Sequence, residues 1–226
     1  MTDQDLDRAI AQAARQPAPQ AIAALTALRD QLAGERAPLD PALGRTWDAL
    51  VEAAGRSADD VADLMTYAEQ RARWLSAARG PHHPHTIAAW SELGETAQLE
   101  SAWDVAIRAW EAIASVPDAD AAGDSALRSA LSHALRGLGA RRLSGPGLAE
   151  ARALFERDLA LHERSGTTSP QVAISLDSLG VALEQLGDRA GALAVRTRQR
   201  AVLAATGASA SQQKAVDDRI AKLSGG

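Results

Sequence analysis

Three histidines stand within four residues of one another, in the stretch GPHHPHT that begins at Gly80. Histidine is the commonest protein ligand of metal ions, so the cluster raises the question of a metal site. Such a site needs imidazoles that converge on one ion, normally with a carboxylate, and His82, His83 and His85 are too close together in a turn to do so. We predict that the stretch ends one helix at Gly80, starts the next at Pro84 and holds no metal.

Other signatures of enzyme chemistry are missing from the sequence. It contains no G-x-S-x-G nucleophile elbow, no H-E-x-x-H zinc motif, no Walker loop and no dinucleotide fingerprint. It contains no cysteine, which excludes disulfides, thiol nucleophiles and zinc–thiolate sites. The other two histidines, His133 and His162, are expected at isolated positions on helices. We therefore predict a protein that is not an enzyme and that needs no cofactor.

The composition predicts a helical chain without membrane segments. Hydrophobic residues make up 46% of the 226 residues and aromatic residues only 3%, so alanine and leucine must build the core. Alanine, leucine, arginine and glutamate have high helix propensities, and no run of β-branched residues indicates a strand. No stretch is long and apolar enough to span a membrane, and the polar N-terminus is unlike a signal peptide. A soluble cytoplasmic protein is expected.

The sequence repeats itself with a period of just over 40 residues. The segment that starts at Trp90 reads W-S-E-L-G-E-T-A, and an alanine and an aromatic residue follow it at Ala106 and Trp110. Four segments share this pattern at spacings of 43, 45 and 41 residues, and their leucines are Leu50, Leu93, Leu138 and Leu179. The leucine and the small residue follow the tryptophan or leucine that opens the segment at three and four positions, so they lie on one helical face with it, and each segment predicts a helical hairpin that stacks on its neighbours.

Glycine in this pattern is expected to let the two helices of a hairpin approach closely. Gly139 and Gly180 are therefore predicted to be close-packing positions. Three residues depart from the pattern, since Asp63 replaces the alanine, Arg142 an apolar residue and Arg196 the aromatic residue. These three positions are expected to pack poorly or to face outward. Four tryptophans are predicted to lie in the core, namely Trp47, Trp90, Trp103 and Trp110, whereas Trp74 receives no assignment.

The pattern resembles the tetratricopeptide repeat, whose signature runs W-x-x-L-G-x-x-Y and continues with alanine and phenylalanine. Its period exceeds the usual 34 residues and is similar to the longer variety of kinesin light chains. That variety often carries G-x-x-H-P-x-T between hairpins, which the stretch from Gly80 to Thr86 matches. The resemblance implies an all-α, right-handed solenoid of antiparallel helical hairpins, with about five repeats and a C-terminal capping helix.

A single solenoid is predicted for residues 1–226. Residues 1–36 are expected to form a degenerate N-terminal hairpin, residues 41–207 the four recognisable repeats and residues 209–223 the capping helix.

Short polar signals mark several expected helix ends. Thr2 and Asp5 resemble a capping box, and Ser57 is expected to cap the second helix of the first repeat. Ser101 is the only turn signal within the second repeat, whereas Gly187 and Asp188 form the turn of the fourth.

The resemblance implies binding of a protein or peptide in a concave groove lined by the first helix of each repeat. By helical phase, the predicted groove residues are Asp48, Glu52, Ser91, Glu95, Gln98, His133, Arg136, Asp177 and Glu184. The acidic balance of this set favours a partner with some basic residues. The net charge of −5 argues against nucleic acid, which requires clustered positive charge. An enzyme or small-ligand sensor on the same scaffold, and self-association into a homo-oligomer, stay open as alternatives.

Overall fold

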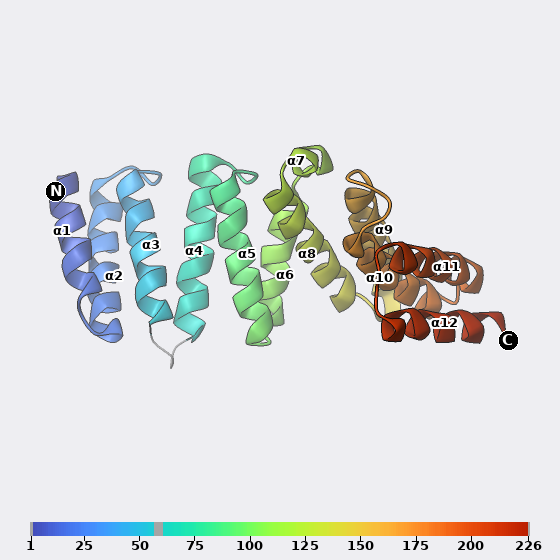
Figure 1. Cartoon of the computed structure of the whole chain (residues 1–226). Coiled ribbons are helices and arrows are strands. Elements are labelled where there is room, and N and C mark those ends of the chain that lie inside the picture. The colour runs from blue at the N-terminus through green and yellow to red at the C-terminus, as the bar shows by residue number, and fades with distance from the viewer. Residues whose placement is uncertain (1, 57–60, 226) are drawn as a thin grey trace. The chain divides into compact units, whose positions relative to one another are not determined.

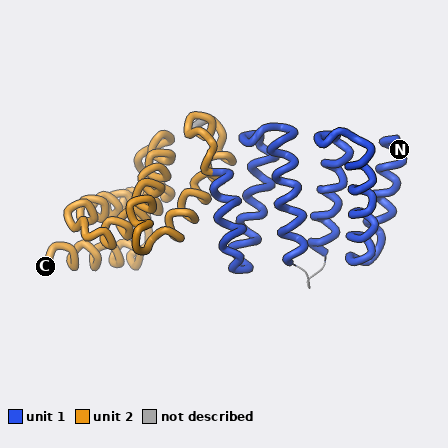
Figure 2. Tube along the Cα trace, turned by 180° about the vertical axis from the view of Figure 1, so that it is seen from behind, with its two compact units in different colours: residues 1–113 blue, residues 114–226 orange. Residues whose placement is uncertain are grey.

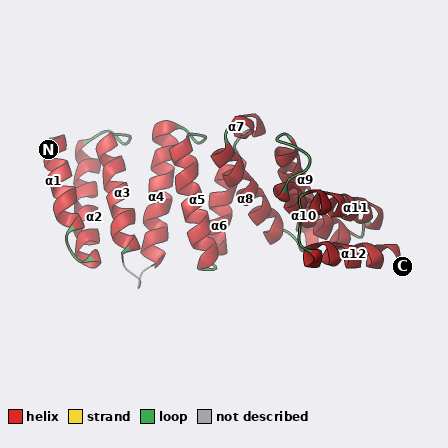
Figure 3. Ribbon diagram, viewed as in Figure 1, coloured by secondary structure: helices red, strands yellow, loops and turns green. Residues whose placement is uncertain are grey.

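The computed structural model describes residues 2–56 and 61–225. Within these residues the chain forms twelve α-helices, a short 3₁₀-helix (η1) and no strand (Figures 1 and 3). The chain divides into two compact units, residues 1–113 and residues 114–226 (Figure 2). The all-α fold class predicted from the sequence is thus confirmed.

The first unit is a stack of antiparallel helices that follow one another in chain order (Figure 1). Its helices are α1 (Asp3–Ala14), α2 (Ala18–Glu35), α3 (Pro41–Gly55), α4 (Val61–Arg79), α5 (Pro84–Leu99) and α6 (Trp103–Ala114), the last residue of which belongs to the second unit. Each of α1 to α4 packs on the helix that follows it, and α1 also contacts α3. Buried alanines and leucines make up most of the core, as the composition predicts.

The second unit continues with hairpins of the same kind. Its elements are α7 (Asp118–Gly123), α8 (Ser125–Arg141), η1 (Gly145–Gly147), α9 (Leu148–Glu163), α10 (Pro170–Leu186), α11 (Arg189–Ala205) and α12 (Ala210–Ser224). Each of α8 to α11 packs on the next α-helix in the chain, and α8 also contacts α10. One core cluster runs through α9 to α12 and includes Phe155, Leu176 and Val216.

The hairpins coincide with the predicted repeats. The pairs α3–α4, α5–α6, α8–α9 and α10–α11 are the four repeats, α1–α2 is the N-terminal hairpin and α12 is the capping helix. Helix α7 was not expected. Arg157 of α9 anchors the segment that leads into it, because its guanidinium donates to the carbonyl oxygens of Ala114 and Val116 at 2.7 Å each and to Asp118 Oδ1 at 2.8 Å.

In the second and third repeats, a glycine of the first helix receives an aromatic side chain of the second helix. A Cβ on Gly94 would lie 2.9 Å from Trp110 Nε1, and a Cβ on Gly139 would lie 2.5 Å from Phe155 Cε1. Both distances are too short for real carbon atoms, so only glycine permits these helix contacts. The close-packing role predicted for Gly139 is confirmed.

The fourth repeat corrects one prediction. Arg196 does not face outward: it is 1% exposed, and its guanidinium lies over Gly180 in the place of the aromatic ring. A Cβ on Gly180 would lie 2.7 Å from Arg196 Cζ, so this glycine also packs closely, as predicted. The burial is possible because charged partners surround the guanidinium. The other two departures, Asp63 and Arg142, are half-buried, and Arg142 Nε lies 2.8 Å from Glu150 Oε1.

The histidine-rich stretch is a helix boundary, as predicted. Gly80 adopts a left-handed conformation, with φ of +98°, at the end of α4. His83 is the N-cap of α5, where its Nδ1 accepts a hydrogen bond from the His85 backbone N–H at 3.2 Å. Pro84 occupies the first helical turn, and Thr86 Oγ1 donates to the Gly80 carbonyl at 2.9 Å.

The remaining predicted signals of helix ends have mixed outcomes. Gly187 is left-handed at the end of α10, with φ of +75°. Ser101 has φ of +59° in the tight connection between α5 and α6, so a serine takes the left-handed position that glycine usually occupies in such a turn. The predicted cap at Ser57 falls outside the described residues.

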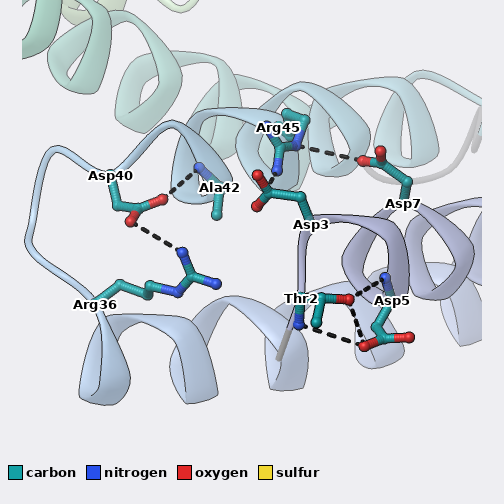
Figure 4. A network of polar contacts seen from close by, with 8 residues as sticks. All are labelled: Thr2, Asp3, Asp5, Asp7, Arg36, Asp40, Ala42 and Arg45. Carbon is teal, nitrogen blue, oxygen red and sulfur yellow. Dashed lines mark hydrogen bonds and ion pairs between the residues drawn. The ribbon is translucent and has the colours of Figure 1, made fainter.

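The N-terminal hairpin is tied to the first repeat by polar contacts (Figure 4). Thr2 and Asp5 form the predicted capping box, in which Thr2 Oγ1 accepts from the Asp5 backbone N–H at 3.2 Å. The hydrogen bond from the Thr2 hydroxyl lowers the pKa of the Asp5 carboxyl. Arg45 of α3 lies 3.1 Å from Asp3 and 3.4 Å from Asp7, and so links α3 to α1.

The tryptophans belong to the packing of the first unit. Trp90 and Trp110 are buried, and Trp47 and Trp103 are half-buried. Trp74 lies against Gly44 of α3, and its indole N–H donates to the Pro38 carbonyl at 3.2 Å.

Candidate functional site

The predicted groove residues of the first unit lie on α3 and α5. Asp48 lines a cavity of about 260 Å³ between α3, α4 and the start of α5. Arg71 of α4 lines the same cavity, and its Nε lies 2.6 Å from Asp48 Oδ1, while its Nη1 lies 3.1 Å from Glu92 Oε2. The charge of Asp48 is thus already balanced within the protein.

The other predicted residues of this unit are less enclosed. Glu52, Glu95 and Gln98 are exposed, and Ser91 is half-buried. The Ser91 hydroxyl is buried and has no hydrogen-bond partner within the described part of the chain. The exposed carboxylates of Glu52 and Glu95 keep their charge available to solvent or to a partner.

The second unit has a polar cavity of about 370 Å³ between α8, the end of α9 and the start of α10, which we call the cationic cavity. Its lining residues are Ser125, Arg128, Ser129, Ser132, Arg136, His162, Ser165, Ser169, Gln171 and Ile174. Of the predicted residues, only Arg136 is among them. His133 is half-buried on α8 but does not line this cavity.

His162 occupies the inner wall of the cationic cavity. Its Nε2 lies 2.9 Å from Ser132 Oγ and 3.7 Å from Asp158 Oδ1. Burial lowers the pKa of the His162 imidazole, the nearby Asp158 opposes this effect, and the positive charges of Arg136 and Arg128 reinforce it. These effects together favour the neutral form of the imidazole.

Serine, histidine and aspartate side chains gather here, but they do not form a catalytic triad. In a triad, one imidazole nitrogen faces the serine and the other faces the aspartate. Here the same nitrogen, Nε2, faces both Ser132 and Asp158. Asp158 is fully buried, and its Oδ2 accepts from Ser175 Oγ at 2.6 Å. The arrangement links α8, α9 and α10 through polar contacts.

A larger cavity, of about 460 Å³, lies between α10, α11 and α12, and we call it the apolar cavity. Its lining residues are Pro170, Ala173, Ile174, Asp177, Gln199, Leu203, Thr206, Ala208, Gln212, Ala215 and Val216. Ile174 of α10 is 48% exposed and borders both cavities. The two cavities are therefore neighbours on either side of α10.

Asp177 and Glu184, which were predicted as groove residues, serve the buried Arg196. Asp177 Oδ1 forms an ion pair with Arg196 Nη1, and Glu184 Oε1 accepts from Arg196 Nε at 2.9 Å. Gln199 Oε1 accepts from Arg196 Nη1 at 2.8 Å, and Glu184 Oε2 also pairs with Arg219 at 2.7 Å. Both acids thus have a structural role, whether or not a partner touches them.

Sequence reasoning missed several residues of the cationic cavity, above all Arg128 and His162. Arg128 lies eight positions before Arg136 on α8, which is close to two helical turns, so helical phase could have placed both on one face. No local signal indicates that His162, thirty residues beyond Ser132, meets that face.

The histidines of the stretch from Gly80 to Thr86 that have described contacts take part in local hydrogen bonds. His83 caps α5, and His85 Nδ1 accepts from Arg79 Nη1 at 2.7 Å. Residues 2–56 and 61–225 contain no group of three or more histidine, aspartate or glutamate side chains placed to hold a metal ion. In the same residues, no helix is both long enough and apolar enough to cross a membrane.

Comparison with known proteins identifies the fold. No protein-family profile matches the sequence, and no curated protein sequence matches it. Two crystal structures of a putative kinesin light chain from Podosopora anserina with nearly identical TPR-like repeats, one of them a variant with a single substitution, each match with a TM-score of 0.51 and 18% identity. Each match covers 88% of this chain and 95% of the other.

A third solved structure, BtubC (BKLC) from P. vanneervenii, matches with a TM-score of 0.50 and 16% identity, over 91% of this chain and 92% of the other. At these identities the likeness concerns the fold, and it agrees with the repeat register found in the sequence. The chain therefore has the tetratricopeptide-like helical-repeat fold of these kinesin-light-chain-like proteins.

Proposed function

We propose that the protein is a non-catalytic scaffold that binds a protein or peptide along the first helices of its hairpins. The observation that carries this proposal is the pair of neighbouring cavities on either side of α10, which share Ile174 as a lining residue and of which one is largely polar and the other largely apolar. Stacked helical repeats commonly present extended binding surfaces of this kind.

The chemistry of the two cavities suits a peptide. The apolar cavity is lined mainly by aliphatic side chains, among them Leu203 and Val216, and the half-exposed Ile174 continues this surface toward the cationic cavity. An extended peptide that crosses α10 would place an apolar side chain on one side and a polar or charged one on the other. Such alternation of apolar anchors and polar contacts is typical of peptide recognition.

The first unit offers a different surface. Glu52 of α3 and Glu95 of α5 are exposed, and neither is engaged in an ion pair among the described residues. We propose that basic residues of the partner contact this pair of carboxylates. Asp48 contributes less to such contacts, since Arg71 balances its charge.

The direct test is capture of partners from the native host, followed by mass spectrometry and by binding measurements with purified partner. Arg136→Ala in the second unit and Glu95→Ala in the first should each weaken binding. Arg152→Ala is a matched control, because Arg152 lies on α9, pairs with Glu156 of its own helix at 2.8 Å and is 46% exposed. If the control variant loses binding while both other variants bind normally, the partner uses the opposite face and the proposal is wrong.

A further inference from the structure

The cationic cavity has a one-sided charge. Its lining contains two arginines, Arg128 and Arg136, together with His162, and no carboxylate is among the lining residues. This composition stands out in a chain whose net charge is −5 and whose acidic residues outnumber its basic ones. A cavity with this charge attracts an anion, and its low-dielectric walls strengthen the attraction.

Arg136 of α8 is the lining residue whose charge is least balanced by carboxylates within the cavity. It is half-buried, and within the described part of the chain no carboxylate pairs with it. Most other arginines that are half-buried or buried, such as Arg71, Arg157 and Arg196, have carboxylate partners within 4 Å. An arginine that is partly withdrawn from water and has no internal carboxylate partner is suited to bind an external anion.

Two carboxylates that neighbour lining residues of the cavity, Asp158 and Asp124, are engaged in contacts of their own. Asp158 lies behind His162, and its Oδ2 accepts from Ser175. Asp124 is the N-cap of α8, where its Oδ1 accepts from the backbone N–H groups of Ala126 at 2.8 Å and Leu127 at 3.1 Å. Neither carboxylate is among the lining residues of the cavity, although the charge of Asp158 acts on His162 from behind the lining.

The donors around the arginines suit a tetrahedral oxyanion. Five serines line the cavity, and the hydroxyls of all but Ser132, which is hydrogen-bonded to His162, can each donate one hydrogen bond to a ligand. One of them, Ser169, is the N-cap of α10, so the positive end of that helix dipole also faces the cavity. A phosphate has more acceptor oxygens than a carboxylate and therefore uses this set of donors more fully.

We propose that the cationic cavity binds a phosphate group, with Arg136 and Arg128 as its charged contacts and the serine hydroxyls as further donors. The cavity is larger than a bare phosphate and leaves room for the side chain that carries it. The phosphate would then belong to a phosphorylated residue of the peptide that occupies the neighbouring apolar cavity, and this part of the inference rests on the proposed function. The positive charges of the two arginines disfavour protonation of His162, and together with burial they lower the pKa of its imidazole.

The test uses the whole chain and two probes. Inorganic phosphate is titrated first, with the His162 ring signals followed by NMR and the affinity by calorimetry. Specific shifts of the His162 signals are expected, and Arg136→Ala should weaken phosphate binding by about tenfold or more, as loss of a charge-assisted hydrogen bond predicts. Arg152→Ala should bind phosphate like the wild type.

A second probe separates free from peptide-borne phosphate. A degenerate peptide library with a fixed phosphoserine is compared with the same library carrying serine. Retention of the phosphorylated library alone, with competition by inorganic phosphate, supports a peptide-borne phosphate. Binding of inorganic phosphate without retention of either library supports a site for free phosphate and contradicts peptide binding at this face.

Two results would overturn the inference. One is the absence of any phosphate-dependent change at His162. The other is equal phosphate binding by the wild type and Arg136→Ala. A captured partner could bind equally well before and after phosphatase treatment, and equally well to Arg136→Ala. That result would leave the proposed scaffold function standing and would contradict the phosphate site.

Discussion

In both the third and the fourth repeat, a side chain of the second helix packs over a glycine of the first helix, but the two side chains differ in chemistry. In the third, Phe155 of α9 lies over Gly139 of α8. In the fourth, Arg196 of α11 lies over Gly180 of α10 in the equivalent place. Both side chains are almost fully buried, at 2% and 1% exposure. The glycine sets the distance between the helices, and a flat group, either a phenyl ring or a guanidinium, fills the space above it.

The difference lies in what each side chain requires of its neighbours. The phenyl ring needs only apolar contacts, which Leu176, Leu179 and the rest of the core cluster supply. The guanidinium needs its charge and its donors satisfied, and Asp177, Glu184 and Gln199 do this. Removing one partner from a buried charge therefore costs more than removing the whole charged group.

The largest effect is expected when the partners of Arg196 are removed. The double variant Asp177→Ala with Glu184→Ala leaves a buried guanidinium without a counter-charge and should lower the free energy of unfolding by about 3–5 kcal/mol. Chemical denaturation followed by circular dichroism measures this. Asp217→Ala is the control, because it removes a carboxylate from the exposed pair with Arg200 and should cost less than about 1 kcal/mol. Equal losses in both variants would mean that Arg196 is not buried in solution.

The two glycines provide the next test. Gly139→Ala places a Cβ against the Phe155 ring and Gly180→Ala places one against the Arg196 guanidinium, so each should cost about 1–3 kcal/mol through overpacking. Gly34→Ala in α2 is a matched control, since nothing lies within 4 Å of the added Cβ there. That substitution should be neutral or stabilise by up to about 1 kcal/mol. Thermal unfolding of the three variants decides whether close approach is the reason for glycine.

The variant Arg196→Met tests whether the fourth repeat needs the positive charge of Arg196 for its stability. Methionine is flexible, apolar and of similar length, so it places an apolar side chain over Gly180, as Phe155 does over Gly139 in the third repeat. Asp177 and Glu184 can then turn to solvent, and Glu184 can keep Arg219 as a partner. The free energy of unfolding should then change by less than about 1.5 kcal/mol in either direction. A loss as large as that of the double acid variant would show that the ion-pair network itself stabilises the fold.

Arg136→Ala should have the smallest effect on stability. Arg136 lies three residues before Gly139 on α8 but has no ion-pair partner among the described residues, so the change should stay within about 0.5 kcal/mol. Its effect should appear in phosphate or partner binding instead. If the free energy of unfolding fell by several kcal/mol, Arg136 would have a structural role in the third repeat, like that of Arg196 in the fourth.

Much of the fold was predictable because its signals are local or periodic. The spacing of Leu93, Leu138 and Leu179 placed the hairpins, since helical geometry repeats wherever the same residues recur. Gly80, His83 and Pro84 marked a helix boundary because each has a conformational preference that acts on the adjacent backbone. Such signals need no knowledge of distant contacts.

The sequence by itself thus determined the helices other than α7, their pairing into hairpins and the close approach at Gly139 and Gly180. Tertiary structure alone decided which polar residues are available to a partner. Arg196 is buried because Asp177 and Glu184 of the preceding helix meet it, and the cationic cavity exists because His162 reaches Ser132 across thirty residues of chain. Helical phase selects a face, but only the packing of neighbouring helices determines whether a charge on that face is balanced internally or remains open to a ligand.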